Sequence, residues 1–314
     1  MNGFLYWERS ILQSGGCKLC IAIFAFISGY AFYKNYFLSN NTSIFKRLIK
    51  FLIIYWTMLV LIAAPYLTFQ GNLSLKMILC SFLAFLHNDD LLMLSFSWYV
   101  KVYVLVILFL PFIKMLSNRV HDWKIELPVL VIFPICITIL LPDSEIQYTT
   151  LPIFLLSTLR LVLTWYPILH IGTMFGKYKV FENIQNMMLR KNIYLVCCLA
   201  LLGCCASILI RKIQLFSLFT DAICVSIFCI SAVVFIKTIN NKLLNKLFVF
   251  LGEYSFQYWL LSGMFFLNTV ELQWILFVPK LSILILIWSF ILITPVAILT
   301  STVSKKIIRK LLPN

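Results

Sequence analysis

Charged residues are scarce in this chain: they make up 12% of its 314 residues, and only 11 residues are Asp or Glu. A soluble domain of ordinary composition carries about a quarter charged residues. Hydrophobic residues account for 62% of the chain, and the mean hydropathy is +0.98. This composition excludes a soluble globular protein and indicates an integral membrane protein.

Glycine is scarce as well, with 10 residues. A loop that cradles a phosphate group needs glycines at close spacing, so we do not expect one here. The nucleophile-elbow pattern G-x-S-x-G, the P-loop and the zinc pattern H-E-x-x-H are all absent. These absences exclude the common templates of soluble enzymes.

Cysteine is plentiful but mostly lies inside apolar runs, where it is expected to act as a small apolar side chain. Cys17 and Cys20 form a single C-x-x-C pattern. No second pair follows at a spacing that would complete a metal site. We therefore expect no metal and no bound cofactor.

Long apolar runs dominate the chain, and a run of about 20 residues is long enough to cross a membrane as a helix. The runs that meet this length are approximately 19–38, 48–69, 96–117, 126–142, 151–176, 192–210, 215–237, 248–270 and 275–301. Leu75–Leu86 is short for a span and is expected to be a re-entrant or interfacial helix, with a tenth span as the alternative. The predicted fold is all-α: a polytopic α-helical membrane protein with about nine to ten transmembrane helices, in a single domain over residues 1–314.

The net charge of +15 comes from short basic clusters between the apolar runs. Loops on the cytoplasmic side of a membrane are enriched in Lys and Arg, so these clusters do not require a nucleic acid, and none is expected as a partner. Most Lys and Arg residues fall in alternate loops, which are 34–50, 114–124, 177–191, 237–246 and the tail 305–310. This pattern predicts a multi-pass protein of the cell membrane with a cytoplasmic C-terminus. With nine spans, the N-terminus of this chain would lie outside.

Two basic residues lie inside predicted spans, where a charge costs several kcal/mol unless it faces protein, water or an anion. Arg160 is either a structural residue, in an ion pair or capping a carbonyl, or a contact for an anionic or acyl-carrying substrate. Lys101 lies close to the interfacial residue Trp98 and can extend its ammonium outward to the membrane surface.

Histidine offers two further candidates. His170 is the imidazole that falls inside a predicted span, and it is either a satisfied structural histidine or a weak candidate for a catalytic base. His87 lies beside Asp89 and Asp90 in a predicted outer loop. These three side chains could bind a cation or a polar substrate, and a solvated loop explains them equally well.

The hairpin Ile21–Tyr55 joins two apolar runs through a basic loop that carries Lys46, Arg47 and Lys50. Five segments of the chain resemble motifs of the acyltransferase 3 family of integral membrane acyltransferases. They are Phe24–Tyr30 around SGY, the following SIFKRLIKFLIIYW, Phe96–Pro111, Tyr166–Tyr178 and Leu251–Ser262. The segments follow the family's order and are spread over nearly the whole chain.

The resemblance implies an enzyme that transfers an acyl group, with acetyl as the expected one, from cytoplasmic acyl-CoA. Acetyl-CoA would be a co-substrate, and the acceptor would be a hydroxyl of a cell-envelope polysaccharide or a lipid-linked sugar. Membrane lipids are the remaining expected partner. Residues expected along the acyl-CoA or substrate path are Ser28, Lys46, Arg47, Lys50, Trp98, Lys101 and Arg160. The basic knot of the hairpin would neutralise the phosphates of coenzyme A.

The chain also departs from the family pattern. Family members begin with a helix that carries an Arg and, about ten residues later, a His regarded as the catalytic base. Arg9 has Leu19 and Cys20 where that His would be expected, and the late motif has Trp259 and Ser262 in place of Tyr and His. We therefore expect a chain that lacks the family's first transmembrane helix, with a family variant that starts outside the membrane as the alternative.

These departures leave two rival functions open. One is a transporter or flippase of a polar glycolipid, with Arg160 and His170 along its route. The other is a non-catalytic relic or membrane scaffold, because acyl transfer to a hydroxyl needs a general base that the sequence does not clearly supply.

Overall fold

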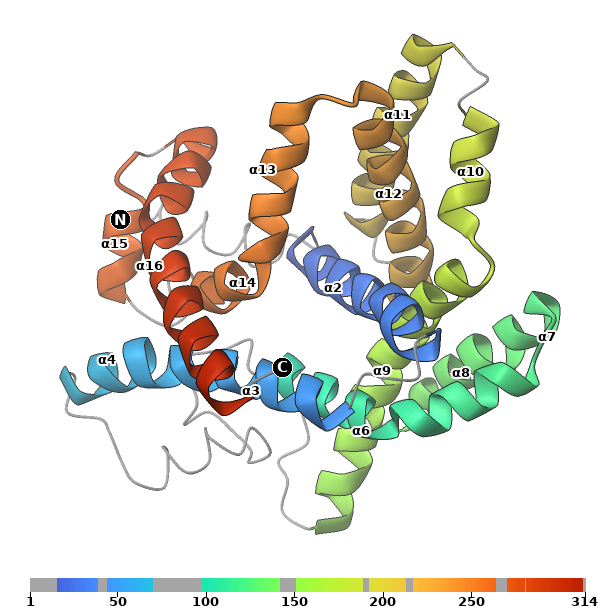
Figure 1. Cartoon of the computed structure of the whole chain (residues 1–314), viewed down its shortest axis with the longest axis horizontal. Helices are drawn as coiled ribbons and strands as arrows, with labels where there is room; N and C mark the ends of the chain where they lie inside the picture. The colour runs from blue at the N-terminus through green and yellow to red at the C-terminus, as the bar shows by residue number, and fades with distance from the viewer. Residues whose placement is uncertain are drawn as a thin grey trace. The chain divides into compact units, whose positions relative to one another are not determined.

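The computed structural model describes residues 16–38, 44–69, 98–141, 151–188, 192–212, 217–263, 270–279 and 281–312 (Figure 1). All regular secondary structure in these ranges is helical. This result confirms the prediction of an all-α fold. Helices suit a membrane because each one satisfies its own backbone hydrogen bonds.

Seven helical stretches within the described ranges are long and apolar enough to cross a membrane. They are Ile44–Tyr66, Val100–Arg119, Trp123–Leu140, Leu155–Lys177, Ile193–Ile210, Thr220–Ile239 and Leu284–Leu311. They identify a multi-pass membrane protein, as the composition predicts. The predicted run 19–38 is also helical, as α2 (Gly16–Phe32) continued by the π-helical turn η1 (Tyr33–Phe37). Leu75–Leu86 lies outside the described residues.

One predicted span is not a single helix. The apolar run 248–270 is divided at Tyr254 into the end of α13 (Lys242–Glu253) and α14 (Ser255–Gly263). The polar sequence at the break explains the interruption, because the Ser255 hydroxyl donates to the Gly252 carbonyl at 2.8 Å. The last predicted span is also displaced. α15 (Val270–Leu276) ends before Pro279, and α16 (Ser282–Leu311) begins after it.

The chain divides into two compact units, which we describe separately. The first comprises residues 1–42 and 109–245, and the second comprises 43–108 and 246–314. The expectation of a single domain over residues 1–314 stays a prediction.

The first unit is organised around α9 (Leu151–Lys177). α2 packs against α9, and so does a helical rod of three consecutive elements. That rod consists of α7 (Trp123–Leu127), η4 (Pro128–Ile132) and α8 (Phe133–Leu140). The other helices described in this unit are α10 (Val180–Met188), α11 (Ile193–Lys212) and α12 (Ser217–Ile239), and the second half of α6 (Trp98–Arg119) belongs to it too. α11 and α12 lie side by side, and α12 also contacts α9 and α2 (Figure 1).

α2 and α9 approach so closely that glycine is required on both helices. A Cβ atom on Gly29 would lie 1.8 Å from the Leu169 carbonyl oxygen, and one on Gly172 would lie 2.0 Å from the Phe26 oxygen. Helices in membranes associate through such small residues, because lipid provides no hydrophobic driving force between them. Gly172 and Gly176 form a G-x-x-x-G pattern on α9, and Gly176 faces the Tyr33 ring.

The second unit contains the remaining helices. They are α3 (Ile44–Met58), η2 (Leu59–Ala63), α4 (Ala64–Phe69), the first half of α6 (Trp98–Arg119), most of α13, and α14 to α16. α3 packs against α16, and α14 also packs against α16. The Phe51 ring on α3 lies 4.2 Å from the Tyr103 ring and 4.8 Å from the Phe256 ring. These contacts join α3 to α6 and α14.

Candidate functional site

The residues singled out in the sequence fall into two groups, one in each unit. Lys46, Arg47 and Lys50 lie within one turn of α3, where Lys50 is exposed and the other two are half-buried. α6 carries the half-buried Lys101 and begins at Trp98, whose side chain lies outside the described part of the chain. The contact between Phe51 and Tyr103 packs these two helices together.

Ser28 and His170 belong to the first unit, on the two helices that cross at the glycines. Ser28 is half-buried on α2, next to Gly29. His170 lies on α9 next to Leu169, whose carbonyl Gly29 approaches. The crossing therefore brings together two of the segments that resemble family motifs, those around SGY and around HIGTMFGKY.

Arg160 caps the end of a helix. Its Nη1 donates to the Leu141 carbonyl oxygen at 2.8 Å. Leu141 follows the last residue of α8, where carbonyl groups have no partner within the helix. This contact agrees with the carbonyl-capping alternative for Arg160. A contact between Arg160 and substrate stays a prediction.

The most developed polar cluster in the first unit surrounds Glu126, which the sequence reasoning missed. Both Glu126 and His170 have fully buried side chains, and His170 Nε2 lies 3.0 Å from Glu126 Oε1. Ser117 Oγ donates to the same oxygen at 2.8 Å. Lys177 Nζ and the Tyr178 hydroxyl donate to Oε2, at 2.6 and 2.7 Å. Four donors, from α6, α9 and the turn after α9, thus converge on one carboxylate of α7.

The charges in this Glu126 cluster are balanced. Lys177 also donates to the carbonyl oxygens of Ser117 and Val120, at 2.7 and 2.6 Å. Beside this ammonium Glu126 is a carboxylate, which only accepts, so His170 Nε2 donates its hydrogen to Glu126 Oε1. A buried charge is tolerated when it is paired and hydrogen-bonded in this way. Burial and the hydrogen bond to Glu126 raise the pKa of the Tyr178 phenol.

His170 Nδ1 faces protein rather than an open space. The hydroxyls of Tyr166 and Thr173 each lie 3.4 Å from it. Thr173 also donates to the His170 carbonyl at 2.6 Å. The imidazole is therefore enclosed by Glu126 on one side and by these two hydroxyls on the other.

The sequence contained a signal for Glu126. It is the acidic residue of the apolar stretch from Ile125 to Leu141, and an acid there needs a buried partner. The pattern of basic loops predicts Lys177 in a loop, although it is the last residue of α9. The two residues are far apart in sequence, so only the packing of α7 on α9 reveals the pair.

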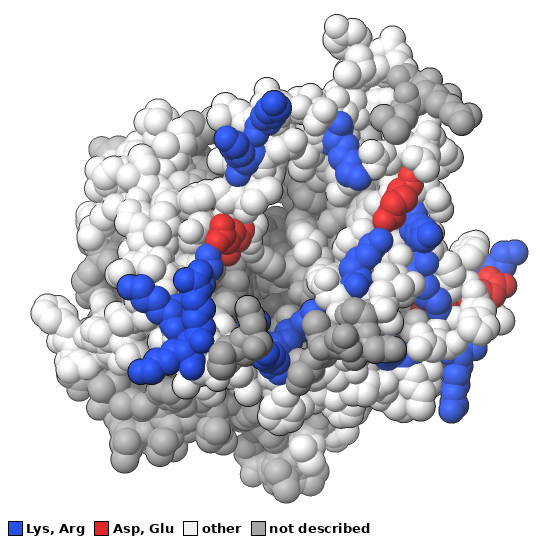
Figure 2. Space-filling view, in the orientation of Figure 1, with Lys and Arg blue, Asp and Glu red and all other residues white. Residues whose placement is uncertain are grey.

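Basic side chains outnumber acidic ones on the face shown in Figure 2. In the first unit, Lys34 Nζ forms an ion pair with Glu182 Oε1 at 2.9 Å, which ties η1 to α10. The hydrogen bond from Lys34 lowers the pKa of the Glu182 carboxyl. Lys114 Nζ donates to the Tyr36 carbonyl at 3.2 Å.

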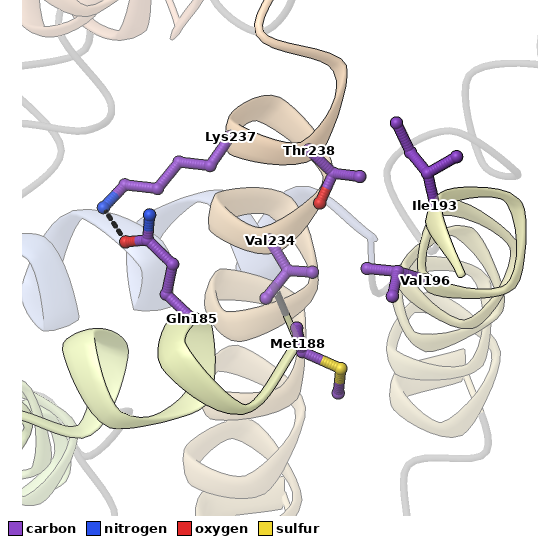
Figure 3. A pocket seen from close by; sticks show the side chains of 7 residues that line it. All are labelled: Gln185, Met188, Ile193, Val196, Val234, Lys237 and Thr238. Carbon is purple, nitrogen blue, oxygen red and sulfur yellow. Dashed lines mark hydrogen bonds between the residues drawn. The ribbon is translucent and has the colours of Figure 1, made fainter. Parts of the chain in front are cut away.

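The described residues of the first unit line a smaller and a larger hollow. The smaller, of about 150 Å³, is lined by α10, α11 and α12 (Figure 3). Lys237 and Gln185 point toward one another across it and form a hydrogen bond, and Met188 lies beside Val234. The larger is an apolar groove of about 770 Å³ between the α7–α8 rod, α9, α10 and α12.

The part of the chain that the structure describes has no group of three or more His, Cys, Asp or Glu side chains able to hold a metal ion. The side chains of Cys17 and Cys20 lie outside it, as do His87, Asp89 and Asp90.

Comparison with known proteins gives one match. Residues 2–303 match the model of a protein family described as an acyltransferase domain. No curated protein and no solved structure matches the chain.

Proposed function

Because the chain belongs to the acyltransferase 3 family and is therefore an acyltransferase, we propose that it transfers an acyl group, with acetyl as the expected one, from acyl-CoA to an envelope hydroxyl. The acceptor is a cell-envelope polysaccharide or a lipid-linked sugar. The observation that carries this proposal is the family match over residues 2–303, nearly the whole chain. The close crossing of two family-like segments at Gly29 and Gly172 supports it.

The reaction converts the thioester of acyl-CoA into an oxygen ester of the acceptor. The acceptor oxygen attacks the thioester carbonyl, a C–O bond forms, and the C–S bond to coenzyme A breaks. The hydroxyl proton leaves the acceptor, and the thiolate of coenzyme A takes up a proton. A base must therefore lie within hydrogen-bond reach of the acceptor hydroxyl at the moment of attack.

Lys46, Arg47 and Lys50 are proposed to hold the phosphates of the donor. They occupy one turn of α3 next to Phe51, whose ring contacts anchor this helix within the second unit. Ammonium and guanidinium groups form charge-assisted hydrogen bonds with phosphate oxygens. Positive charge on one side of the membrane also attracts an anionic substrate before contact.

The remaining residues of the proposed path are Ser28, Trp98, Lys101 and Arg160. The proposal includes the nine to ten spans and the orientation that the Lys and Arg pattern predicts, with the C-terminus in the cytoplasm and the N-terminus of this chain outside. The alternation of basic and neutral loops supports this orientation.

We assign His170 a positioning role. Its Nε2 is committed to Glu126 and its side chain is fully buried, so a substrate hydroxyl has no access to Nδ1. Its place on α9 next to the glycine crossing lets it fix this helix against α7.

A transfer assay tests the proposed function. Membranes from a host that lacks the gene are supplied with either the wild-type chain or a variant in which Lys46, Arg47 and Lys50 are all changed to Gln. They are then incubated with acetyl-CoA labelled in the acetyl group. We expect alkali-labile label in the envelope glycan with the wild-type chain and much less with the variant.

Label that stays absent from every glycan and lipid-linked sugar, at normal protein levels, would contradict the proposed activity. Flux of a glycolipid across proteoliposomes without any acyl donor would support a transporter instead. Immunoblotting of both membrane preparations serves as the control for expression.

A further inference from the structure

The larger groove of the first unit has the dimensions of a binding site. It has a volume of about 770 Å³, within the range of pockets that hold organic ligands, about 300–1,000 Å³. Its lining is mostly apolar and includes Met174 and Phe175 of α9 and Ile227 of α12. Tyr178 is shared between this groove and the Glu126 cluster, and the proposed donor site does not use this space.

One wall of the groove runs along the axis of the α7–α8 rod. Trp123, Leu127, Val131 and Ile135 line it at intervals of four residues, which places them on one helix face. At 1.5 Å per residue, the stripe from Trp123 to Ile135 is about 18 Å long. Half of a bilayer's hydrocarbon core is about 15 Å thick, so the groove has the length of one leaflet.

One end of the groove carries the side chains of a membrane interface. Trp123 is half-exposed there and begins a membrane span, a position typical of interfacial aromatic residues. The exposed Lys124 and Lys179 are the chain neighbours of the lining residues Trp123 and Tyr178. The nearby Asp122 carboxylate accepts from the Lys124 backbone N–H at 2.9 Å.

From this arrangement we infer that the groove binds a phospholipid of the adjacent leaflet with an anionic phosphate headgroup. One acyl chain lies along the stripe from Trp123 to Ile135, and the phosphate faces Lys124 and Lys179. The groove opens sideways at Ile132 and Ile223, which are both partly exposed within spans, so a leaflet lipid can enter without crossing the protein.

The bound chain would reinforce the packing around the Glu126 cluster. Tyr178 lines the groove and donates its hydroxyl to Glu126 Oε2 at 2.7 Å. Met174, in the last turn of α9, packs against Val131 and Ile135. A lipid seated between these side chains binds only the folded protein and therefore stabilises it.

Photo-crosslinking tests this inference directly. The full chain is purified in detergent and placed in nanodiscs of phosphatidylcholine with a small fraction of phosphatidylglycerol that carries a diazirine on one acyl chain. After irradiation, peptide mass spectrometry locates the label. We expect it on the α9 segment around Met174 and on the α7–α8 rod around Val131.

A double variant tests the contribution of the headgroup, and a matched pair of single variants tests that of the acyl chain. Lys124→Gln combined with Lys179→Gln should lower the affinity for phosphatidylglycerol by about fivefold per lysine, with little effect on phosphatidylcholine. Ile135→Trp fills the groove and should abolish labelling there. Ile139→Trp is its matched control, because Ile139 is exposed on the same helix and does not line the groove.

Label scattered over exposed apolar surfaces, or label that Ile135→Trp leaves unchanged, would overturn the inference. Displacement of phosphatidylglycerol by an equimolar polyprenyl phosphate would also overturn it and would assign the groove to an isoprenoid carrier. Acyl transfer is not measured in these experiments, so their outcome is independent of the proposed function.

Discussion

Two of the few glycines in the chain allow two helices to pack in direct backbone contact. Gly29 and Gly172 let the backbones of α2 and α9 meet, and each would place a Cβ about 2 Å from a carbonyl oxygen of the other helix. Backbone atoms cannot move aside as the end of a side chain can. At the residue scale, these two positions determine whether the first unit packs at all.

Gly29→Ala and Gly172→Ala should each destabilise the protein severely, by about 3 kcal/mol or more, because the two helices must separate. Gly252→Ala is the matched control, since an added Cβ there meets nothing within 4 Å. Thermal unfolding of the purified variants in detergent measures the difference. Equal melting temperatures for all three variants would contradict the close crossing.

The Glu126 cluster gives a second prediction. Glu126→Gln leaves the Lys177 ammonium with carbonyl partners only, and breaking a buried ion pair costs about 3–5 kcal/mol. Glu253→Gln removes the carboxylate of the exposed Lys305–Glu253 pair and should cost less than about 1 kcal/mol. Thermal unfolding of the two variants under identical conditions compares them, and a similar loss in both would argue against the buried network.

His170 is expected to act through position rather than through proton transfer. His170→Gln should lower the thermal stability, because Glu126 Oε1 loses a donor held at 3.0 Å. The pH profile of kcat/KM should keep its shape. If the variant has normal stability but its kcat/KM no longer falls on one side of the pH profile, His170 would instead be the catalytic base.

The Lys34–Glu182 pair predicts a dependence on pH. The folded-state pKa of Glu182 is lowered from the ordinary 4.5, so the stability from this pair is present above that value and is lost as the pH falls through the folded-state pKa. Both side chains are partly exposed, which limits the effect to less than about 1 kcal/mol. Melting temperatures of the wild type and Glu182→Gln should differ at about pH 7 and converge as the pH falls through the folded-state pKa of Glu182.

At the scale of elements, hydropathy predicted the helices that are apolar over their whole length. α9, α11 and α12 begin and end within about three residues of the predicted runs. The run 248–270 was wrongly predicted as one helix. Gly252, Glu253 and Ser255 interrupt it, but hydropathy averaged over the length of a membrane span does not detect so short a polar segment.

α10 was missed for the opposite reason. Its sequence, VFENIQNMM, is too short and too polar for a span. It is ordered by contacts that the sequence does not display, between the Phe181 ring and the rings of Phe26, Tyr30 and Phe175.

The candidate site was predictable only in part. The spacing of charges along the chain could suggest Lys46, Arg47 and Lys50 as a group, but it could not pair Glu126 with His170.

The basic turn of α3 leads to a prediction at this scale. Changing Lys46, Arg47 and Lys50 together to Gln should raise the KM for acyl-CoA by about tenfold or more, if each charge contributes about 0.5–1 kcal/mol to phosphate binding. The effect should shrink at high salt. Lys306→Gln, an exposed residue on α16, is the control and should leave KM unchanged.

At the scale of the whole molecule, each unit supplies something different to the proposed reaction. The second carries the basic turn of α3, and the first carries the glycine crossing, the Glu126 cluster and the apolar groove. A membrane acyltransferase needs a place for an anionic donor and a rigid helical frame around the acceptor. These features provide candidates for both.

A single-turnover measurement separates acyl transfer to an envelope hydroxyl from simple hydrolysis of acyl-CoA. Purified wild-type protein in proteoliposomes is mixed with excess lipid-linked glycan and a limiting amount of acetyl-CoA, labelled in both the acetyl group and coenzyme A. We expect free coenzyme A and alkali-labile acetyl on the glycan to appear together in equal amounts. Release of coenzyme A with free acetate alone, or no release at all from well-folded protein, would contradict this expectation.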